Sequence, residues 1–248
     1  MSREKLFGSR GRMSVPILRT KGEDPAGPPV PPTTQITIPP PPDPDPFRDP
    51  ISTALVDLIF ERGYEAVTER AIVDRAGTTL GEFHHRFVDK LDCTIKTIEA
   101  AAQDFGWMVE TAYGSGSDWR EGLRASAWAI ADHIDRHPTF IHVLVIGLMQ
   151  TKSEMLRVLR EESLMYGAQV IERGRAEAPD PSAVPAAAGM VAMGSIAQLL
   201  THRLQKGADL ELRETVPQML YLSVRPYLGE EAAREELHAP RPPGSFVR

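Results

Sequence analysis

The sequence predicts an all-α fold with two parts, a small N-terminal helix-turn-helix domain and a larger C-terminal helical domain. Apolar residues recur at spacings of three and four along most of the chain, which is the period of an amphipathic helix. The period-two alternation typical of strands does not persist anywhere. A chain of 248 residues, 42% hydrophobic and 25% charged, has the composition of a globular protein with a sizeable core.

The first 46 residues differ in composition from the rest of the chain. Residues 1–22 contain six lysines and arginines against the single acid Glu4. From Pro25 to Pro50 proline dominates, and since proline lacks a backbone N–H, this stretch cannot form a hydrogen-bonded helix or sheet. We therefore expect residues 1–46 to form a disordered arm, basic at its tip and proline-rich at its base.

The first two helices are predicted within residues 47–92. Apolar side chains line one face from about residue 50 to 62, and Gly63 is placed to end this helix. Thr68 is expected to cap the second helix, because a threonine hydroxyl accepts a hydrogen bond from a free N–H of the first turn. Gly77 then ends the second helix.

A third helix is predicted to begin at Thr79, which has the spacing of a capping box with Glu82 and precedes the apolar residues Leu80, Phe83 and Phe87. Two short helices joined by a tight glycine turn and preceded by another helix form a helix-turn-helix, whose second helix enters the major groove of DNA. This arrangement leaves seven polar or small residues facing outward: Thr78, Thr79, Gly81, Glu82, His84, His85 and Arg86.

The C-terminal domain is predicted over residues 93–228. Asp89 is expected to cap a long helix that crosses into this domain, and the break at residues 114–117 ends it. Further helices are predicted at about residues 119–136, 138–149, 154–177, 183–206 and 210–227. Residues 229–248 mix charge with proline and are predicted to be a flexible tail.

The segment ISTALVDLIFERGYEAVTERAIVDRAGTTLGEFHHRFVDKLDC resembles the N-terminal domain of tetracycline-repressor (TetR) type regulators. The resemblance implies a sequence-specific DNA-binding regulator of transcription, usually a ligand-responsive repressor that acts as a dimer. It also implies that Thr68, Thr79, Gly81, His84, His85 and Lys90 lie where family members contact DNA. Together with the outward-facing residues, the candidate DNA-binding set is Thr68, Thr78, Thr79, Leu80, Gly81, Glu82, His84, His85, Arg86 and Lys90.

Charge leaves a second interpretation open. The chain has a net charge of -6, and residues 51–92 hold five basic against eight acidic residues. The family usually has a tyrosine at the position of His84, and the acid at Glu82 repels phosphate. One hypothesis is that the basic arm wraps the duplex and supplies the missing positive charge. The alternative is a helical dimer that has lost operator binding and serves as a ligand- or protein-binding module.

The C-terminal domain is predicted to bind a small apolar effector and to form a homodimer. Its candidate pocket residues are Trp128, Phe140, Leu144, Leu148 and Met165, although such apolar stripes are also typical of plain core. Alanine and glycine are frequent in residues 183–206, so a partner helix can approach closely. We expect this helix and the helix at 210–227 to form a four-helix dimer interface.

Other function classes receive little support from the sequence. Cys93 is the single cysteine, so no intrachain disulfide is possible, and the chain is expected to be cytoplasmic. No apolar run has the length of a membrane span. His133 and His137 lie four residues apart, but no cysteine or carboxylate completes a metal site, so neither a metal nor another cofactor is expected. Common catalytic motifs are absent, and we expect no enzyme activity.

Overall fold

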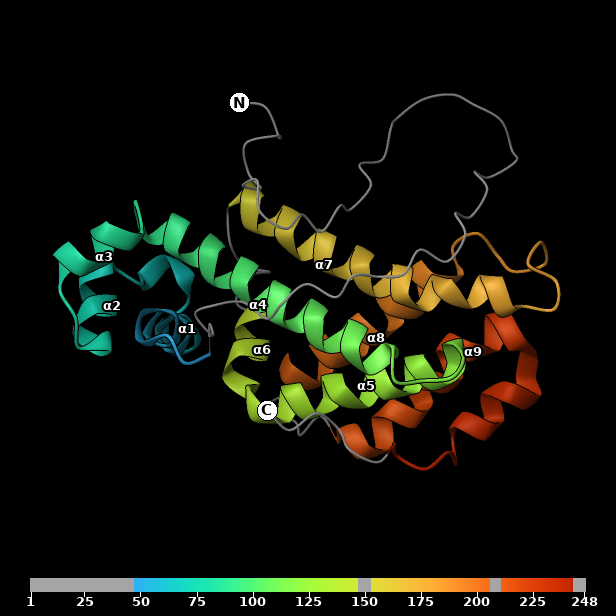
Figure 1. Ribbon diagram of the computed structural model, residues 1–248. Helices are drawn as coiled ribbons and strands as arrows, with labels where there is room; N and C mark the ends of the chain where they lie inside the picture. Colours follow the sequence, from blue (N-terminus) through green and yellow to red (C-terminus); the bar gives the residue numbers. More distant parts are fainter. Residues whose placement is uncertain (1–46, 147–152, 206–210, 243–248) are drawn as a thin grey trace, which may run out of the picture. The chain divides into compact units, whose positions relative to one another are not determined.

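The computed structural model describes residues 47–146, 153–205 and 211–242 (Figure 1). The elements are α1 (Pro50–Arg62), the 3-10 turn η2 (Tyr64–Ala66), α2 (Glu69–Ala76), α3 (Leu80–Arg86), α4 (Lys90–Tyr113), α5 (Trp119–Arg136), α6 (Pro138–Val145), α7 (Glu154–Glu172), η4 (Arg173–Glu177), α8 (Ala188–Gln205) and α9 (Leu212–Glu236). Within these residues there is no strand. The predicted all-α class is confirmed, as is the order of a helix-turn-helix domain followed by a C-terminal helical domain. The predicted arm, residues 1–46, lies outside the described residues.

Helices α1, α2 and α3 form the head, by which we mean residues 47–92, and they share one hydrophobic core. Leu55 of α1, Ile72 of α2 and Phe83 of α3 are each fully buried. Val73 also lies in this core, so the helices accommodate its branched side chain. Gly77 adopts a left-handed conformation with φ of 69° between α2 and α3, a conformation that glycine adopts without the steric penalty of a Cβ.

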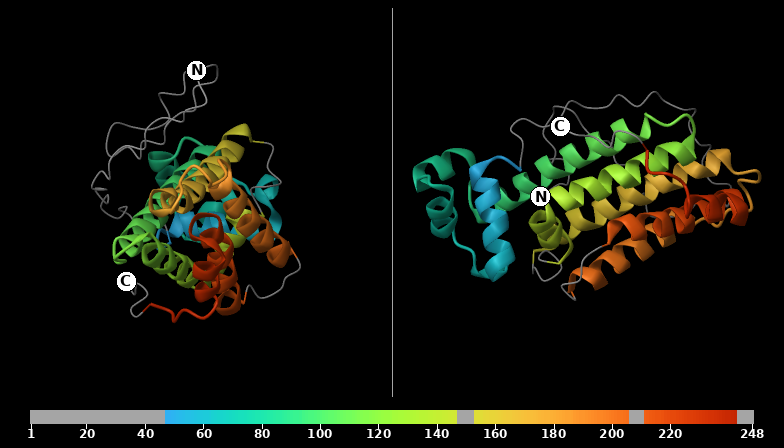
Figure 2. Two further views of the ribbon diagram at one scale, coloured as in Figure 1. Left: turned by 90° about the vertical axis from the view of Figure 1, so that its right-hand side faces the viewer. Right: turned by 90° about the horizontal axis from the view of Figure 1, so that it is seen from below.

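Helix α4 connects the head to the C-terminal domain. It begins at Lys90 beside α3, with Asp89 as its N-cap, and then runs for 24 residues alongside α5 (Figures 1 and 2). Cys93, near its start, packs into the core of the head. Met108 and Val109, further along, pack into the core of the C-terminal domain. The one helix therefore contributes to both hydrophobic cores.

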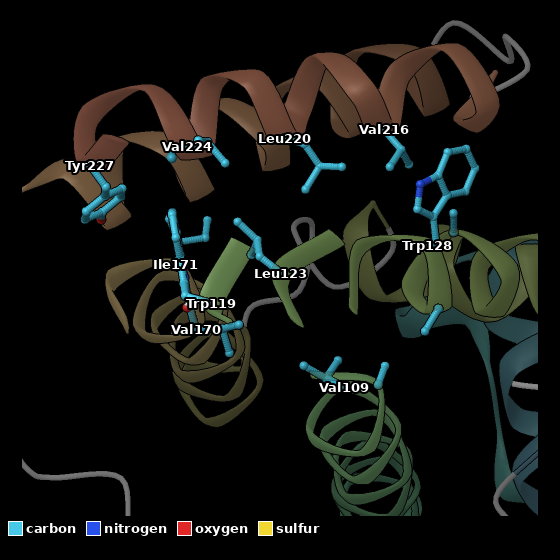
Figure 3. Packing of buried hydrophobic residues seen from close by; sticks show 14 of the residues in the cluster. Val109, Trp119, Leu123, Trp128, Val170, Ile171, Val216, Leu220, Val224 and Tyr227 are labelled. Carbon is cyan, nitrogen blue, oxygen red and sulfur yellow. Dashed lines mark hydrogen bonds between the residues drawn. The ribbon is translucent and has the colours of Figure 1, made fainter. Parts of the chain in front are cut away.

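The core of the C-terminal domain lies between α4, α5, α7 and α9. Figure 3 shows Leu220, Val224 and Tyr227 of α9 facing Leu123 of α5, together with Trp119. The Trp119 indole N–H donates to the backbone oxygen of Val170 at 3.4 Å, and its ring meets that of Tyr227 edge to face at 5.1 Å.

Two predicted boundaries at the C-terminal end differ from the structure. The expected helix at 183–206 begins only at Ala188, after Pro185. The flexible tail expected from residue 229 is wrong for its first part, because α9 kinks at Gly229 and continues to Glu236. The cause is Glu236, which is 1% exposed and accepts hydrogen bonds from Arg120 and Arg124 of α5.

No helix in residues 47–146, 153–205 and 211–242 has the length and apolar character that crossing a membrane requires.

Candidate nucleic-acid interface

The orientation of α3 is fixed by a capping box and by one buried aromatic ring. The Glu82 N–H donates to Thr79 Oγ1 at 3.2 Å, and the Thr79 N–H donates to Glu82 Oε2 at 3.0 Å. The predicted capping box is confirmed. With Phe83 fixed inward, a turn of about 100° per residue places Gly81 and His85 almost opposite the core. Glu82 and His84 flank them, and all four are exposed.

The hydroxyl groups at the start of α3 are held by Glu82. Thr78 Oγ1 and Thr79 Oγ1 both donate to Glu82 Oε2, the latter at 3.1 Å. The hydrogen bond from Thr78, with those from Thr79, lowers the pKa of Glu82, so this carboxylate is ionised at neutral pH. Thr78 and Thr79 were predicted to contact DNA; in the structure their hydroxyl protons already have an acceptor.

The predicted contacts Lys90 and Arg86 also have partners within the head. Lys90 Nζ donates to the backbone oxygens of Tyr64 and Val67 at 2.9 and 2.8 Å, and it lies 4.3 Å from the centre of the Tyr64 ring. Arg86 Nη1 donates to Asp49 Oδ1 at 2.8 Å. The sequence placed Lys90 among the residues that contact DNA, whereas the structure holds its ammonium group on two carbonyl oxygens.

Two more of the predicted residues have local partners. His84 Nε2 lies 3.4 Å from Glu69 Oε2, and the other oxygen of Glu69 accepts the backbone N–H of Lys90. The Thr68 hydroxyl caps α2 by accepting the Ala71 N–H at 3.2 Å, as its predicted capping role requires.

His85, Gly81 and Leu80 are the predicted residues that remain open on the outer side of α3. His85 makes no hydrogen bond or ion pair with any described residue. A Cβ on Gly81 would meet only the Thr79 hydroxyl, at 3.7 Å. Leu80 is apolar, but as the first residue of α3 it turns partly outward and is 36% exposed, as its place in the candidate DNA-binding set requires.

Sequence reasoning missed two acids, Asp49, which pairs with Arg86, and Glu69, which lies beside His84. Burial by itself would raise the pKa of Asp49, but hydrogen bonds from Arg86 and Ser52 outweigh burial and lower it. The sequence did contain a signal for Asp49, since an aspartate directly before a proline at the first helical position is typical of an N-cap. No such local signal identifies Glu69 as the partner of His84.

The candidate effector residues are only partly brought together. Phe140 and Leu144 of α6 line an apolar cavity of about 10 Å³ against α1 and α4. Trp128 of α5 lies in the core of the C-terminal domain, and Met165 is half-buried on α7. Leu148 lies outside the described residues. The cavity is about large enough for one water molecule, far below the roughly 300–1,000 Å³ typical of ligand sites.

Cys93, His133 and His137 take part in packing. Burial raises the pKa of the Cys93 thiol to about 12, so the reactive thiolate is scarce. Phe47 stacks on His137 with ring centres 4.1 Å apart and meets His133 edge to face at 5.0 Å. No group of three or more His, Cys, Asp or Glu within the described ranges is arranged to hold a metal ion.

Comparison with known proteins identifies the head. Residues 51–94, which span α1 from its second residue, α2, α3 and the start of α4, match the family model of bacterial regulatory proteins of the tetR family. The head is therefore similar to the DNA-binding domain of tetR-family regulators. This match agrees with the predicted helix-turn-helix and with the family resemblance of the same segment.

Two solved structures share the fold over most of this chain. The fatty acid degradation regulator FadR from Bacillus halodurans is 19% identical, with a TM-score of 0.61 over 71% of this chain and 97% of that one. A protein described as a TetR-family transcriptional regulator from Syntrophomonas wolfei is 18% identical, with a TM-score of 0.56 over 71% and 92%. No curated protein sequence matches. At these identities the two likenesses establish the fold alone.

Proposed function

We propose that this protein is a cytoplasmic, ligand-responsive repressor that binds a palindromic operator as a homodimer through the outer face of α3. The observation that carries the proposal is the presentation of α3. Its capping box and Phe83 fix the helix in one orientation, and Gly81 and His85 are left exposed without partners. A rigid, exposed second helix is what major-groove reading requires.

Gly81 supports close approach of DNA to α3. A glycine inside a helix costs about 0.5–1 kcal/mol relative to alanine. Here the protein itself leaves room for a Cβ, since the nearest atom would be 3.7 Å away. Packing within the protein therefore does not require glycine at position 81. Close approach of the DNA backbone to this position would require it. The remaining candidate contacts are the side chains of Thr68, Thr78, Thr79, Leu80, His84, His85, Arg86 and Lys90.

Dimerisation is supported by apolar side chains exposed on α8 and α9. Met190 and Val191 of α8 are 47% and 65% exposed, and Leu222 of α9 is 47% exposed. A second copy that covers these helices would remove this surface from water. A symmetric dimer also supplies two reading helices. Its affinity for two half-sites then exceeds the weak affinity of one head for one half-site.

A small apolar effector fits the composition of the C-terminal domain better than a polar one. The cavity beside Phe140 and Leu144 is lined mainly by apolar side chains of α1, α4 and α6. Because this cavity is so small, an effector that binds there must widen it. Widening the cavity displaces α1, which belongs to the head. The shared fold with a regulator of fatty acid degradation is consistent with an apolar effector class.

The test is selection of binding sites from random duplex DNA by the full-length protein. The wild-type protein is expected to enrich a palindrome, and His85→Ala is expected to lose it, whereas the control His238→Ala, which replaces an exposed histidine after α9, retains it. Gly81→Ala is the sharper variant. It should leave the free energy of unfolding unchanged or slightly higher while weakening DNA binding, a combination that damage to the fold cannot produce.

The basic arm is tested in the full chain by changing Arg10, Arg12, Arg19 and Lys21 to glutamine. If the arm contacts phosphate, this variant binds less tightly and with a shallower dependence of log K on log salt. If no motif is enriched by the wild-type protein with or without cell extract, the repressor proposal is wrong. The alternative, a helical dimer that binds a ligand or a protein and not an operator, would then be favoured. Arg86 and Lys90 support that alternative, because both are already bonded within the protein.

A further inference from the structure

The two oxygens of the Glu82 carboxylate have different surroundings. Oε2 accepts three hydrogen bonds, from the Thr78 hydroxyl and from the hydroxyl and backbone N–H of Thr79. Oε1 accepts none from the described residues, and the side chain is exposed. The three bonds fix the carboxylate in place, so that Oε1 is a preoriented hydrogen-bond acceptor on the reading helix.

His85 lies beside this acceptor. Residues three apart on a helix are neighbours, separated by about 60° around the axis. Glu82 and His85 nevertheless form no ion pair, because the carboxylate is turned back toward Thr78 and Thr79. The outer face of α3 therefore carries a fixed acceptor and, next to it, an imidazole with no partner.

The major groove offers few matches for a fixed negative acceptor. Cytosine presents only the N4 amino donor, guanine presents two acceptors, and thymine presents an acceptor and a methyl group. Adenine presents a donor beside the acceptor N7, which an ionised carboxylate repels. The hydrogen bonds that lower the pKa of Glu82 also keep it ionised and unable to donate to guanine or thymine.

We propose that Glu82 is a specificity-determining residue, whose Oε1 selects cytosine at one position of each operator half-site, with His85 placed to donate to the guanine of the same or the adjacent base pair. This inference rests on the proposed function, since it names what the reading helix reads. It gives Glu82 two roles at once, because Oε2 caps the helix while Oε1 reads a base. The repulsion between Glu82 and phosphate is then compensated by the base contact that Glu82 makes.

The test compares binding motifs selected from random duplex DNA by full-length wild-type protein, Glu82→Gln and Glu65→Gln. Glutamine also completes a capping box. Because Thr78 and Thr79 donate, the glutamine oxygen must take the place of Oε2, which turns the amide NH2 outward as a donor. Glu65→Gln is the matched control, since it removes one negative charge from the head at an exposed residue that has no hydrogen bond or ion pair with the described residues.

The wild-type protein is expected to prefer cytosine over guanine by about tenfold at one position of each half-site. Glu82→Gln should lose that preference at this position alone and shift it toward bases that present an acceptor, while Glu65→Gln leaves the motif unchanged. A wild-type motif that Glu82→Gln reproduces in full would overturn the inference and leave the repressor proposal standing. A wild-type protein that enriches no motif would overturn both.

Discussion

Asp49 offers the sharpest test of how the head is held together, because its two carboxylate oxygens accept hydrogen bonds from two different elements. Oδ2 caps α1 by accepting the Ser52 N–H at 2.9 Å, and Oδ1 accepts Arg86 Nη1 at 2.8 Å. Asp49→Ala removes both contacts, whereas Asp49→Ser retains an oxygen suited to the cap and removes only the link to Arg86. The pair of variants therefore separates the cap from the ion pair.

The expected losses follow from these contacts. An N-cap contributes about 1 kcal/mol. The bond to Arg86 is charge-assisted, but the arginine side chain is 38% exposed, so solvent screening reduces its contribution to about 1 kcal/mol. Asp49→Ala should thus lose about 2 kcal/mol and Asp49→Ser about 1 kcal/mol. For a chain of this size these correspond to drops in Tm of about 4–8 °C and 2–4 °C.

The assay is thermal unfolding followed by circular dichroism, at one protein concentration throughout. Because the folded-state pKa of Asp49 is depressed, its contribution is present above the unfolded-state pKa of about 3.9 and is lost as pH falls through the folded-state value. The gap between wild type and Asp49→Ala should therefore be full at pH 7 and close below about pH 4. Equal Tm values for wild type and Asp49→Ala at pH 7 would refute this reasoning.

Three further predictions test other parts of the chain. Glu236→Ala should destabilise the protein by about 3 kcal/mol, because it leaves Arg120 and Arg124 without their buried carboxylate. Hydrogen exchange should also speed up in residues 230–236, and unchanged exchange there would contradict the role of Glu236 in anchoring this segment. Cys93 should react with a thiol reagent at pH 8 far more slowly in the native protein than in urea, since it is buried with a raised pKa; equal rates would contradict its burial. Gly77→Ala should lower the free energy of unfolding by about 1 kcal/mol in urea titration because φ is 69° there, and a stabilised variant would contradict that conformation.

The helices and their starts could be predicted because the signals are local. Thr68, Thr79 and Asp89 each cap a helix by bonding an N–H three residues ahead, and a cap of this kind is visible in a window of four residues. Gly63 and Gly77 end α1 and α2 for an equally local reason, since both adopt positive φ. The helix-turn-helix follows from these caps together with the spacing of apolar residues.

The partners of the charged side chains could not be predicted in this way. Lys90 bonds carbonyl oxygens 26 and 23 residues earlier in the chain, and Arg86 bonds a carboxylate 37 residues earlier. Glu236 meets Arg124 across 112 residues. Composition marked residues 229–248 as charged and proline-rich, but only the packed fold brings a buried acid in that segment to two arginines. A charged side chain therefore indicates a possible contact, and the tertiary structure decides which contact is made.

The pairing of these charges bears on how the regulator finds its operator. Each of the five cations in residues 51–92 has a partner in the protein: Arg62 and Arg75 contact Glu61, Arg70 contacts Asp74, Arg86 contacts Asp49, and Lys90 contacts two carbonyl oxygens. Non-specific affinity comes from neutralising phosphates with free cations. With eight acids and five paired cations, residues 51–92 therefore gain little affinity from the DNA backbone. Under the proposed function, discrimination between operator and bulk DNA therefore rests on base contacts made by α3 and on the pairing of two heads, because the weak backbone contribution is common to every sequence.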